Sequence, residues 1–417
     1  MRVLLLTPYL PHARVGHGGG TAVREMCRQL ARVHELHVIS LVRSGESDLV
    51  EATAADLGCR IHPLDFHDQN VTGIHKPALI LSRLWAGGRG ILRGYPYYVE
   101  KYWSQGLSRR ILALVEDIQP DAVQIEYLQL SLLTKDLRTW KTRQLAAGHK
   151  TPVLCASTHE LGSVPRLRRA KLTTNPLSRL MLRAQAAAWR RLQRDATHWS
   201  DLTFCVTDDD RAILEADGGL HCLTVPLGMD TDTLQPDRDP ADSPRLLFVG
   251  SFGHGPNRTA AKFLIDNVWP QVAKYRTDAV LDVVGRGSRR FLDDLGVTDS
   301  RVRGHGFVED LSDFYRYGTL FVAPLPEGGG IKIKILEAMA RGIPVVTTPV
   351  GAEGIVLPRD DAAWIVPADD RFHETVIAAL DDPAQAVLKA TKARRIMEEQ
   401  FSWRGIVNRL TEHYGGG

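Results

Sequence analysis

Short apolar runs that alternate with longer amphipathic segments are the feature of this sequence that most constrains its fold. The runs have the length of buried strands, and the segments between them have the spacing of helices that bury one face. Strands that alternate with helices form βαβ units, in which the strands pair in parallel and helices cover the sheet. The first series comprises strands Val3–Leu6, Leu36–Val42, Ala122–Ile125, Val153–Ala156, Leu202–Val206 and Leu223–Val225, with helical patterns at Thr21–Val33 and Leu107–Ile118 among others.

The alternation restarts after a polar, proline-rich stretch at residues 235–243, QPDRDPADS, whose composition is typical of a linker. We therefore expect an α/β protein with two Rossmann-like, doubly wound parallel-sheet domains that face a central cleft. The expected domains are residues 1–234 and 244–400, and residues 401–417 form a last helix. The second series comprises strands Arg245–Gly250, Val280–Val284, Leu320–Ala323 and Ile343–Thr347, and helices Asn257–Val272, Leu311–Tyr317 and Ile331–Arg341.

The composition argues against several classes of protein. The net charge is +3, from 52 basic and 49 acidic residues, which does not predict a nucleic-acid-binding protein. Five cysteines without a short CxxC spacing argue against both a disulfide framework and a zinc site. No apolar run reaches the roughly 18 residues of a transmembrane helix, and the first run is too short for a secretory signal. We expect a cytoplasmic protein with reduced cysteines.

A glycine cluster follows the first predicted strand. Residues 16–20 read GHGGG, and a helix is expected to begin near Thr21. Consecutive glycines let a ligand approach the backbone closely, and the free N–H groups at a helix N-terminus attract phosphate. Gly18, Gly19 and Gly20 are therefore candidates for binding a phosphate or an acceptor. A surface loop without function would have the same composition.

The strongest candidate site follows the third strand of the second series. Residues 324–346 read PLPEGGGIKIKILEAMARGIPVV, in which a triple glycine precedes a helix. Lys334 and Glu337 lie three residues apart and share one face of that helix. They suit a nucleotide sugar, because the lysine would pair with the diphosphate and the carboxylate would accept hydrogen bonds from ribose hydroxyls. The alternative is an exposed salt bridge between the two, worth about 0.2–0.5 kcal/mol.

Two further loops follow the first two strands of the second series. The second loop, VGRGSRR, has two glycines of a dinucleotide fingerprint, but Arg290 stands where the third glycine would allow close packing. We therefore interpret both as loops that line the ligand cleft, and not as an NAD site. The candidate residues on these loops and on the helix after the first loop are Gly250, Ser251, Asn257, Arg258, Gly285 and Arg286.

A histidine follows strand Val153–Ala156. His159 lies in the segment STHE, and a histidine at a strand end can orient a sugar or a transferring proton. The alternative is a histidine with a structural role only. Glu126, after strand Ala122–Ile125, is expected to be structural.

Residues 166–194 form a strongly basic segment in a nearly neutral chain. Asn175 is suited to cap a helix that has Pro176 in its first position. The segment contains apolar residues and no acid, so we expect an interfacial helix that binds an anionic membrane surface. The alternative is a solvated helix packed on its own domain. The nine basic residues are Arg166, Arg168, Arg169, Lys171, Arg179, Arg183, Arg190, Arg191 and Arg194.

Six segments, in this order, resemble the retaining glycosyltransferases of family 4, which have the GT-B fold, and the resemblance covers nearly the whole chain. VPLGMDTDTLQP (225–236) is similar to that family's interdomain connector, and LLFVGSFGHGPNRTAAKFL to the entry of its C-terminal domain. LDVVGRG, VRGHGFVEDLSDFY and LEAMARGIPVV follow in the family order. FSWRGIVNRL (401–410) is similar to its last helix, which crosses back to the first domain.

The resemblance implies transfer of a sugar from a UDP- or GDP-sugar to a glycan or lipid-linked acceptor in cell-surface polysaccharide or glycolipid synthesis. The reaction would retain the anomeric configuration and need neither metal nor cofactor, with the donor on the C-terminal domain and the acceptor on the N-terminal one. Glu337 matches the second glutamate of the family's E-x7-E motif, which holds the ribose, and His159 matches the histidine opposite the donor sugar. Arg258 and Lys334 are candidates for the phosphate-binding pair. The other residues expected at the donor are Phe307, Val308, Glu327, Gly328, Gly329, Gly330, Ile331 and Lys332.

One position departs from the family pattern. Gly329 stands where the first glutamate of E-x7-E should be, and the nearest acid, Glu327, is two residues too early. That glutamate normally binds sugar hydroxyls, so the donor sugar stays open. Our hypothesis is that the N–H groups of Gly329 and Gly330 take over part of its role. Two alternative functions also stay open: another GT-B enzyme, such as a nucleotide-sugar epimerase or phosphorylase, and a catalytically inactive nucleotide-sugar-binding scaffold.

Overall fold

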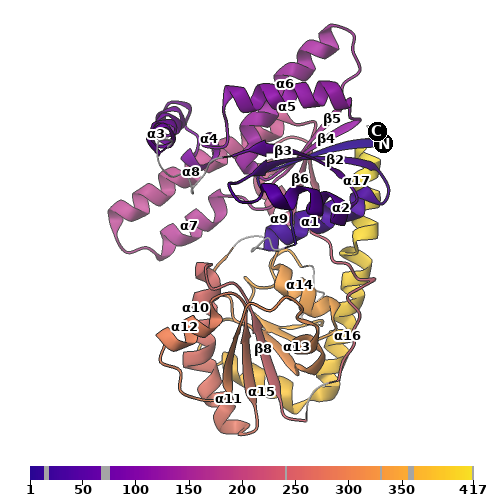
Figure 1. The fold of residues 1–417 in the computed structure, drawn as a ribbon. Helices are drawn as coiled ribbons and strands as arrows, with labels where there is room; N and C mark the ends of the chain where they lie inside the picture. The colour runs from indigo at the N-terminus through magenta and orange to yellow at the C-terminus, as the bar shows by residue number, and fades with distance from the viewer. Residues whose placement is uncertain (14–17, 67–75, 240–241, 329–330, 356–360, 416–417) are drawn as a thin grey trace. The chain divides into compact units, whose positions relative to one another are not determined.

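The computed structural model describes residues 1–13, 18–66, 76–239, 242–328, 331–355 and 361–415. The chain separates into two compact units (Figure 1): unit 1 is Met1–Pro226 with Ile406–Gly417, and unit 2 is Leu227–Gly405. Residues 227–234, which we expected in the first domain, belong to unit 2. The Met229 N–H donates to the carbonyl of Phe401 over 2.7 Å, and the Arg394 guanidinium donates to the Thr231 carbonyl over 2.7 Å.

The sheet of unit 1 has seven strands in the order β3-β2-β1-β4-β5-β6-β7, and the pairings between them are parallel. The order reverses between β1 and β4, which is the position where open α/β sheets bind ligands. The sequence did not predict β3, because it is an exposed edge strand that contains Pro63. The strands are β1 (Arg2–Thr7), β2 (Glu35–Val42), β3 (Arg60–Asp65), β4 (Ala122–Glu126), β5 (Val153–Ser157), β6 (Leu202–Cys205) and β7 (Cys222–Thr224).

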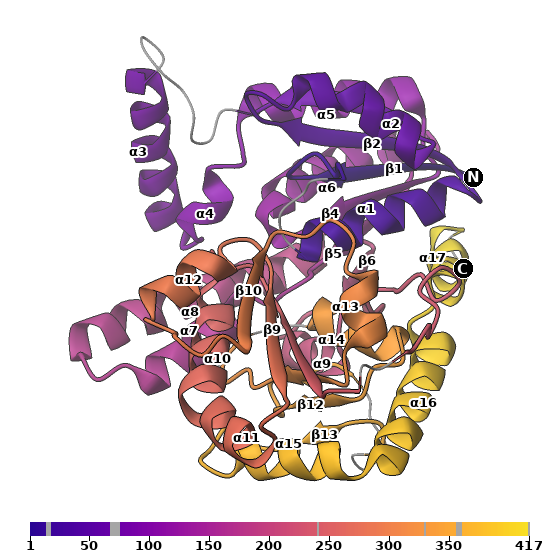
Figure 2. The ribbon, with the colours of Figure 1, turned by 60° about the horizontal axis from the view of Figure 1, so that its bottom comes forward.

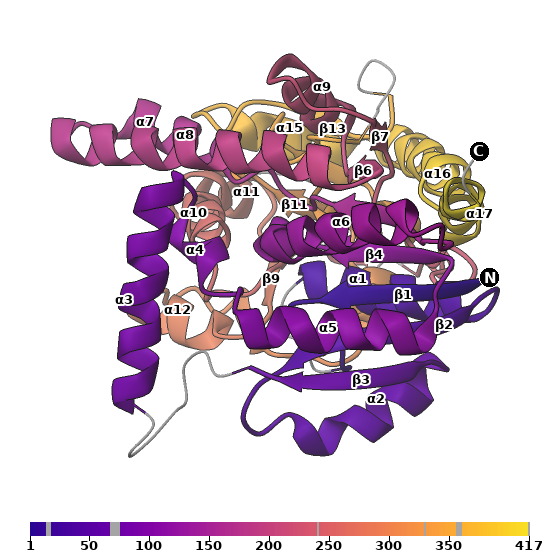
Figure 3. The same cartoon turned by 90° about the horizontal axis from the view of Figure 1, so that it is seen from above.

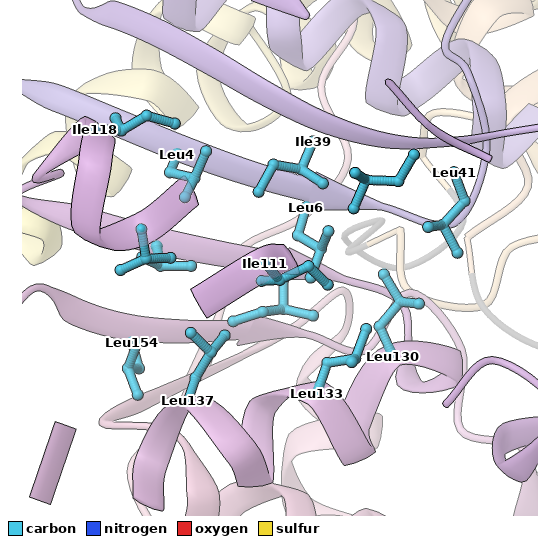
Figure 4. Close-up of a cluster of buried hydrophobic side chains, with 14 of the residues drawn as sticks. Leu4, Leu6, Ile39, Leu41, Ile111, Ile118, Leu130, Leu133, Leu137 and Leu154 are labelled. Atoms are coloured by element: carbon cyan, nitrogen blue, oxygen red, sulfur yellow. The ribbon is translucent and has the colours of Figure 1, made fainter. Parts of the chain in front are cut away.

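Helices cover both faces of this sheet. Val123 and Ile125 of β4 lie in an apolar core with α5 and α6, and Figure 4 shows Ile111, Leu133 and Leu137 of these helices against Leu4 and Leu6 of β1. Because side chains alternate along a strand, the residues between them on β4 point to the opposite face. The helices of unit 1 are α1 (Gly18–Ala31), α2 (Val50–Leu57), α3 (Lys76–Arg93), α4 (Tyr97–Glu100), α5 (Gln105–Ile118), α6 (Ser131–Ala146), α7 (Ser163–Leu172), α8 (Pro176–Trp199) and α9 (Asp208–Ala216), together with most of α17 (Trp403–Tyr414).

The sheet of unit 2 has six parallel strands in the order β10-β9-β8-β11-β12-β13, with the reversal between β8 and β11. The edge strands β10 and β13 were not predicted, because β10 has the polar sequence VRGHG and β13 has two residues. The strands are β8 (Arg245–Val249), β9 (Val280–Val284), β10 (Val302–Gly306), β11 (Leu320–Ala323), β12 (Val345–Thr347) and β13 (Trp364–Ile365).

The helix predicted at Asn257–Val272 is interrupted. A π-helical turn, η4 (Leu264–Val268), separates α10 from α11, which are both visible beside β9 in Figure 2. Pro270 has no N–H to donate to the carbonyl one turn earlier, which accounts for the wider turn. The helices of unit 2 are α10 (Gly255–Phe263), α11 (Trp269–Tyr275), α12 (Ser288–Asp294), α13 (Ser312–Tyr317), α14 (Ile333–Ala340), α15 (Phe372–Asp381) and α16 (Pro383–Gln400).

Candidate functional site

Two glycines bring the loops after β8 and β9 together in unit 2. The Gly250 N–H donates to the Val284 carbonyl over 2.9 Å, and the Gly285 N–H donates to the Gly306 carbonyl over 2.8 Å. Gly285 has a φ of 134°, and a Cβ there would lie 2.1 Å from the Gly250 carbonyl oxygen. A Cβ on Gly250 would lie 3.2 Å from the Nζ of Lys334. The absence of both side chains therefore exposes loop backbone beside the Lys334 ammonium group.

Lys334 lies in the first turn of α14 and is partly buried. Its Nζ donates to the Asn257 Oδ1 over 2.5 Å and lies 5.1 Å from the centroid of the Phe248 ring. Both groups are neutral, and no carboxylate pairs with this ammonium among the residues that the structure describes. Burial, followed by the positive charge of Lys332, lowers the pKa of Lys334 to about 7. An anionic ligand would supply the missing counter-charge.

Glu337 pairs with Arg341 and not with Lys334. The Arg341 Nε lies 3.2 Å from the Glu337 Oε1, and its Nη1 donates to the Ser312 Oγ over 3.1 Å. The salt bridge between Lys334 and Glu337, which was the alternative to a ligand site, therefore does not form. Burial raises the pKa of Glu337, and Arg341 opposes that rise. Arg341 binds Oε1, and within the described ranges no residue hydrogen-bonds the second carboxylate oxygen, which can therefore accept hydrogen bonds from ligand hydroxyls.

The two exposed arginines predicted at the donor lie on aromatic rings. The Arg258 guanidinium on α10 is 5.3 Å from the centroid of Phe291, and that of Arg286 is 5.5 Å from Phe307, which is itself exposed. Cation–π contacts of this kind leave the guanidinium N–H groups available to an anion. Val308 follows Phe307 and is partly buried.

The loop between β11 and α14 is held by charged contacts. The Lys332 Nζ lies 3.6 Å from the Glu353 carboxylate, so this lysine already has a counter-charge, and Glu327 accepts from Thr259 over 3.5 Å. Gly328 has a φ of 141°, and Ile331 is buried. Ser251, in the loop after β8, accepts through its carbonyl from the Asn257 amide over 2.9 Å. Gly329 and Gly330 lie outside the described residues.

A second cluster lies in unit 1, at the ends of β4 and β5. The rings of Tyr127 and His159 stack with their centroids 3.8 Å apart and 8° between their planes. Both residues have left-handed backbones, with φ of 69° for Tyr127 and 54° for His159. Such strain costs about 1–3 kcal/mol per residue and is concentrated at functional sites.

The glycines after β1 join this cluster. Gly18, Gly19 and Gly20 are the first turn of α1, which corrects the expectation of a loop followed by a helix at Thr21. A Cβ on Gly19 would lie 2.2 Å from the Tyr127 hydroxyl oxygen, so glycine is required for the ring to pack there. The first turn of α1 therefore lies close to the Tyr127–His159 stack.

Glu126 lies beneath His159 and is fully buried. Its Oε2 accepts a hydrogen bond from the His159 Nε2, and its Oε1 accepts one from the Gln124 amide. Sequence reasoning assigned Glu126 a structural role and missed Gln124, although alternation along β4 places both side chains on one face. Within the described ranges, no three histidine, cysteine or acidic side chains gather as metal ligands.

Comparison with known proteins finds similarity to glycosyltransferases over part of the chain. Residues 243–382 match the family model described as Glycosyl transferases group 1. The lipopolysaccharide core biosynthesis mannosyltransferase LpsB of Rhizobium meliloti (strain 1021) is 30% identical over 215 residues, which are 46% of this chain and 60% of that protein. The phosphatidyl-myo-inositol mannosyltransferase of Mycobacterium leprae (strain TN) is 31% identical over 178 residues, 41% of this chain and 45% of that protein. The chain thus spans less than two thirds of either relative.

Solved structures show the same fold over both units. The structure of Anabaena Alr3699/HepE in complex with UDP has a TM-score of 0.65, 14% sequence identity, and an alignment that covers 99% of both chains. The two parallel sheets and their strand orders agree with this likeness. The chain has the GT-B fold, and its residues 243–382 are similar to the glycosyl transferases group 1 family.

Proposed function

We propose that the protein is a retaining glycosyltransferase that moves a sugar from a nucleotide diphosphate sugar to a glycan or lipid-linked acceptor. The observation that carries this proposal is the Lys334 ammonium group, which lies beside glycine-rich backbone and whose partners among the described residues are neutral. The donor diphosphate supplies its counter-charge, and the free carboxylate oxygen of Glu337 accepts from the ribose. The lipopolysaccharide and phosphatidylinositol named for the two relatives support a lipid-linked acceptor.

Electrostatic stabilisation accounts for catalysis in this proposal. Departure of the sugar leaves negative charge on the diphosphate and an oxocarbenium-like sugar. A fixed ammonium and fixed N–H dipoles stabilise that charge in the transition state without reorganising. Lys334 thereby neutralises the phosphate charge that a divalent cation neutralises in other phosphate sites. We therefore propose that the reaction needs no metal and that EDTA leaves the activity unchanged. His159 and the first turn of α1 bind sugar or acceptor hydroxyls in unit 1.

The function is tested by a thermal-shift screen with UDP, GDP and their sugars, followed by a transfer assay. A ligand present at 100 times its Kd adds about 2.7 kcal/mol of apparent stability, which raises Tm measurably. We expect one nucleotide series to stabilise the protein, and its sugar donor to yield free nucleoside diphosphate plus a glycosylated product. Binding without product over a broad acceptor panel would instead indicate the inactive scaffold.

We also propose that α7 and α8 bind an anionic membrane surface. No described helix is both long enough and apolar enough to span a bilayer. The two helices lie side by side and project from the rest of unit 1 (Figure 3). Asn175 caps α8 through the N–H groups of Leu177 and Ser178, as predicted. Exposed apolar side chains gather near the turn that joins the helices: Leu172, Leu177, Leu180 and Met181.

The basic residues of α7 and α8 differ in whether a carboxylate neutralises their charge. The second half of α8 is neutralised, because Arg190 pairs with Asp217, and Arg194 lies 2.9 Å from Asp195. The sequence segment contains no acid, but Asp195 follows it directly, and Asp217 reaches Arg190 from the end of α9. Lys171 and Arg183 are exposed beside the apolar residues, and this half of the hairpin is the part suited to a membrane interface.

Vesicle co-sedimentation tests the membrane surface. We expect binding to vesicles with anionic lipid at low salt, and weaker binding at high salt. Each basic residue near an anionic leaflet contributes about 1 kcal/mol, so Lys171→Gln/Arg183→Gln should weaken binding about 30-fold. The control Arg109→Gln/Arg110→Gln removes the same charge from the exposed face of α5. Equal losses in both double variants would mean that net charge, and not this surface, drives binding.

A further inference from the structure

A chain of buried hydrogen bonds connects the last helix of the protein to His159. Tyr414, the last residue of α17, is 1% exposed and donates through its hydroxyl to the Gln124 Oε1. The Gln124 amide donates to the Glu126 Oε1, and the Glu126 Oε2 accepts from the His159 Nε2. All four residues belong to unit 1, and all are buried.

The direction of each bond in this chain follows from chemistry. An ionised carboxylate only accepts hydrogen bonds, so the end of Gln124 that faces Glu126 is the amide nitrogen. The carbonyl end of Gln124 therefore faces Tyr414, whose hydroxyl has to donate. Burial raises the pKa of Tyr414 well above its ordinary value, which keeps that proton in place. Loss of the Tyr414 hydroxyl would remove one of the two hydrogen bonds that hold the Gln124 amide in this orientation, the other being the bond to Glu126.

The groups around Glu126 leave His159 as the ionisable side chain that hydrogen-bonds its carboxylate. The other ionisable groups that face this carboxylate are neutral, because burial raises the pKa of each of them. A buried carboxylate is stable only when it is hydrogen-bonded, and its described donors are Gln124 and His159. The neutral groups are Tyr9, Cys27, Tyr127, Cys155 and Tyr414.

This arrangement determines which nitrogen of His159 is available. With Nε2 donating to Glu126, the proton of the neutral ring is on Nε2 and the lone pair is on Nδ1. The Nδ1 atom is buried and has no hydrogen-bond partner among the described residues. It is thus the atom that can meet a substrate group.

We propose that Tyr414 and Gln124 are positioning residues for His159, which act by holding Glu126 so that the imidazole is protonated on Nε2 and presents Nδ1 to the substrate. The effect on turnover rests on the proposed transferase function, whereas the effect on the imidazole does not. Tyr414 lies 290 residues from Gln124 in the chain, so the last turn of α17 takes part in the site although it contacts no substrate.

The test is side-chain ¹⁵N NMR of the full-length protein labelled on histidine, with the His159 signals assigned by His159→Gln. We expect the wild type to show the Nε2-protonated tautomer. In Tyr414→Phe and in Gln124→Met, a mixture of tautomers or a shifted Nε2 resonance is expected. The control Tyr95→Phe also deletes a tyrosine hydroxyl in unit 1, one that donates to Asp195 over 2.8 Å, and should leave the His159 signals unchanged.

Kinetics supply the second measurement. By analogy with outer-shell partners that fix a histidine tautomer, both variants should lower kcat about 10- to 100-fold with little change in the donor KM. Unchanged His159 resonances in both variants would overturn the proposal, whatever the activity. Changed resonances with an unchanged kcat would overturn its link to turnover. Changed resonances in a protein that transfers no sugar would uphold the positioning role and contradict the transferase assignment.

Discussion

Replacing Lys334 with methionine is expected to lower kcat about 10²–10³-fold, the usual loss when one fixed donor to a developing oxyanion is removed. The ammonium is expected to interact more strongly with the departing diphosphate than with the intact donor, so kcat should fall more than the donor KM rises. Folding should be preserved, because the variant removes a desolvated charge whose partners are Asn257 and the Phe248 ring. Steady-state kinetics and thermal unfolding of the same preparation measure both effects.

Lys389→Met is a matched control for this variant. Lys389 also lies over an aromatic ring, 5.2 Å from the centroid of Trp364, and also donates to a neutral acceptor, the Ala363 carbonyl, over 3.2 Å. It belongs to α16 and not to the loops after β8 and β9. We expect its kcat to stay near the wild-type value. Equal kcat values for the wild type and Lys334→Met would show that Lys334 has no role in the reaction.

The same lysine predicts how nucleotide affinity depends on pH. In the proposed function its cationic form binds the diphosphate, and in the free protein that form predominates below a pKa of about 7. Affinity should therefore be constant below pH 7 and weaken by up to about tenfold per pH unit above it, where binding takes up as much as one proton. Calorimetry in buffers of different ionisation enthalpy measures that proton. In Lys334→Met the nucleotide affinity should no longer depend on pH in this range. A pH dependence that persists would point to another group, such as His254, whose pKa burial also lowers.

The second large effect is expected for Gly285→Ala. The left-handed backbone at this position costs a non-glycine residue about 1–3 kcal/mol. The new Cβ would also lie 2.1 Å from the Gly250 carbonyl oxygen, which is backbone and cannot rotate away. We expect the free energy of unfolding to fall by about 3 kcal/mol or more. Nucleotide binding should be lost even where the variant stays folded, because the two loops have to separate beside Lys334.

Gly255→Ala is the control for that variant. Gly255 is the first residue of α10, and a Cβ there meets no atom within 4 Å. Alanine is expected to be neutral or to stabilise by up to about 1 kcal/mol, since it restricts the unfolded chain. Denaturant unfolding of the two variants gives the comparison. A Gly285→Ala protein as stable as Gly255→Ala would show that the β8 and β9 loops adjust without cost.

The interior of each sheet was predictable from the sequence, and the edges were not. Central strands such as β1 and β8 are buried on both faces and therefore read as apolar runs. The edge strands β3, β10 and β13 lack that signal, since each is short, polar or half-exposed. The first helix begins at Gly18, a few residues before the predicted start near Thr21. Consecutive glycines have no side chains whose spacing could distinguish a helical turn from a loop.

Candidate-site residues that directly follow strands could be predicted from the sequence. Contacts between residues far apart in the sequence could not. Gly250, Gly285 and His159 could be placed because ligand-binding groups of parallel sheets follow the carboxyl ends of strands. Arg341 was missed, although it is four residues from Glu337, because the basic partner was sought at Lys334. Tyr414 carries no local signal for a role near β4. Only the tertiary structure shows that the two meet.

The division of α17 between the two units limits how this protein can be recombined with others. The Trp403 ring packs against Gly228 in unit 2, where an added Cβ would lie 2.4 Å from the ring, whereas the residues from Ile406 onward belong to unit 1. A gene fragment that ends at Pro226 would therefore lack part of its own hydrophobic interior and would leave the Gln124 carbonyl without its donor. Under the proposed function, chimaeras meant to exchange donor specificity have to replace an internal segment, about 227–402, and retain the recipient's own terminal helix. Two successive gene segments joined end to end would not preserve either unit.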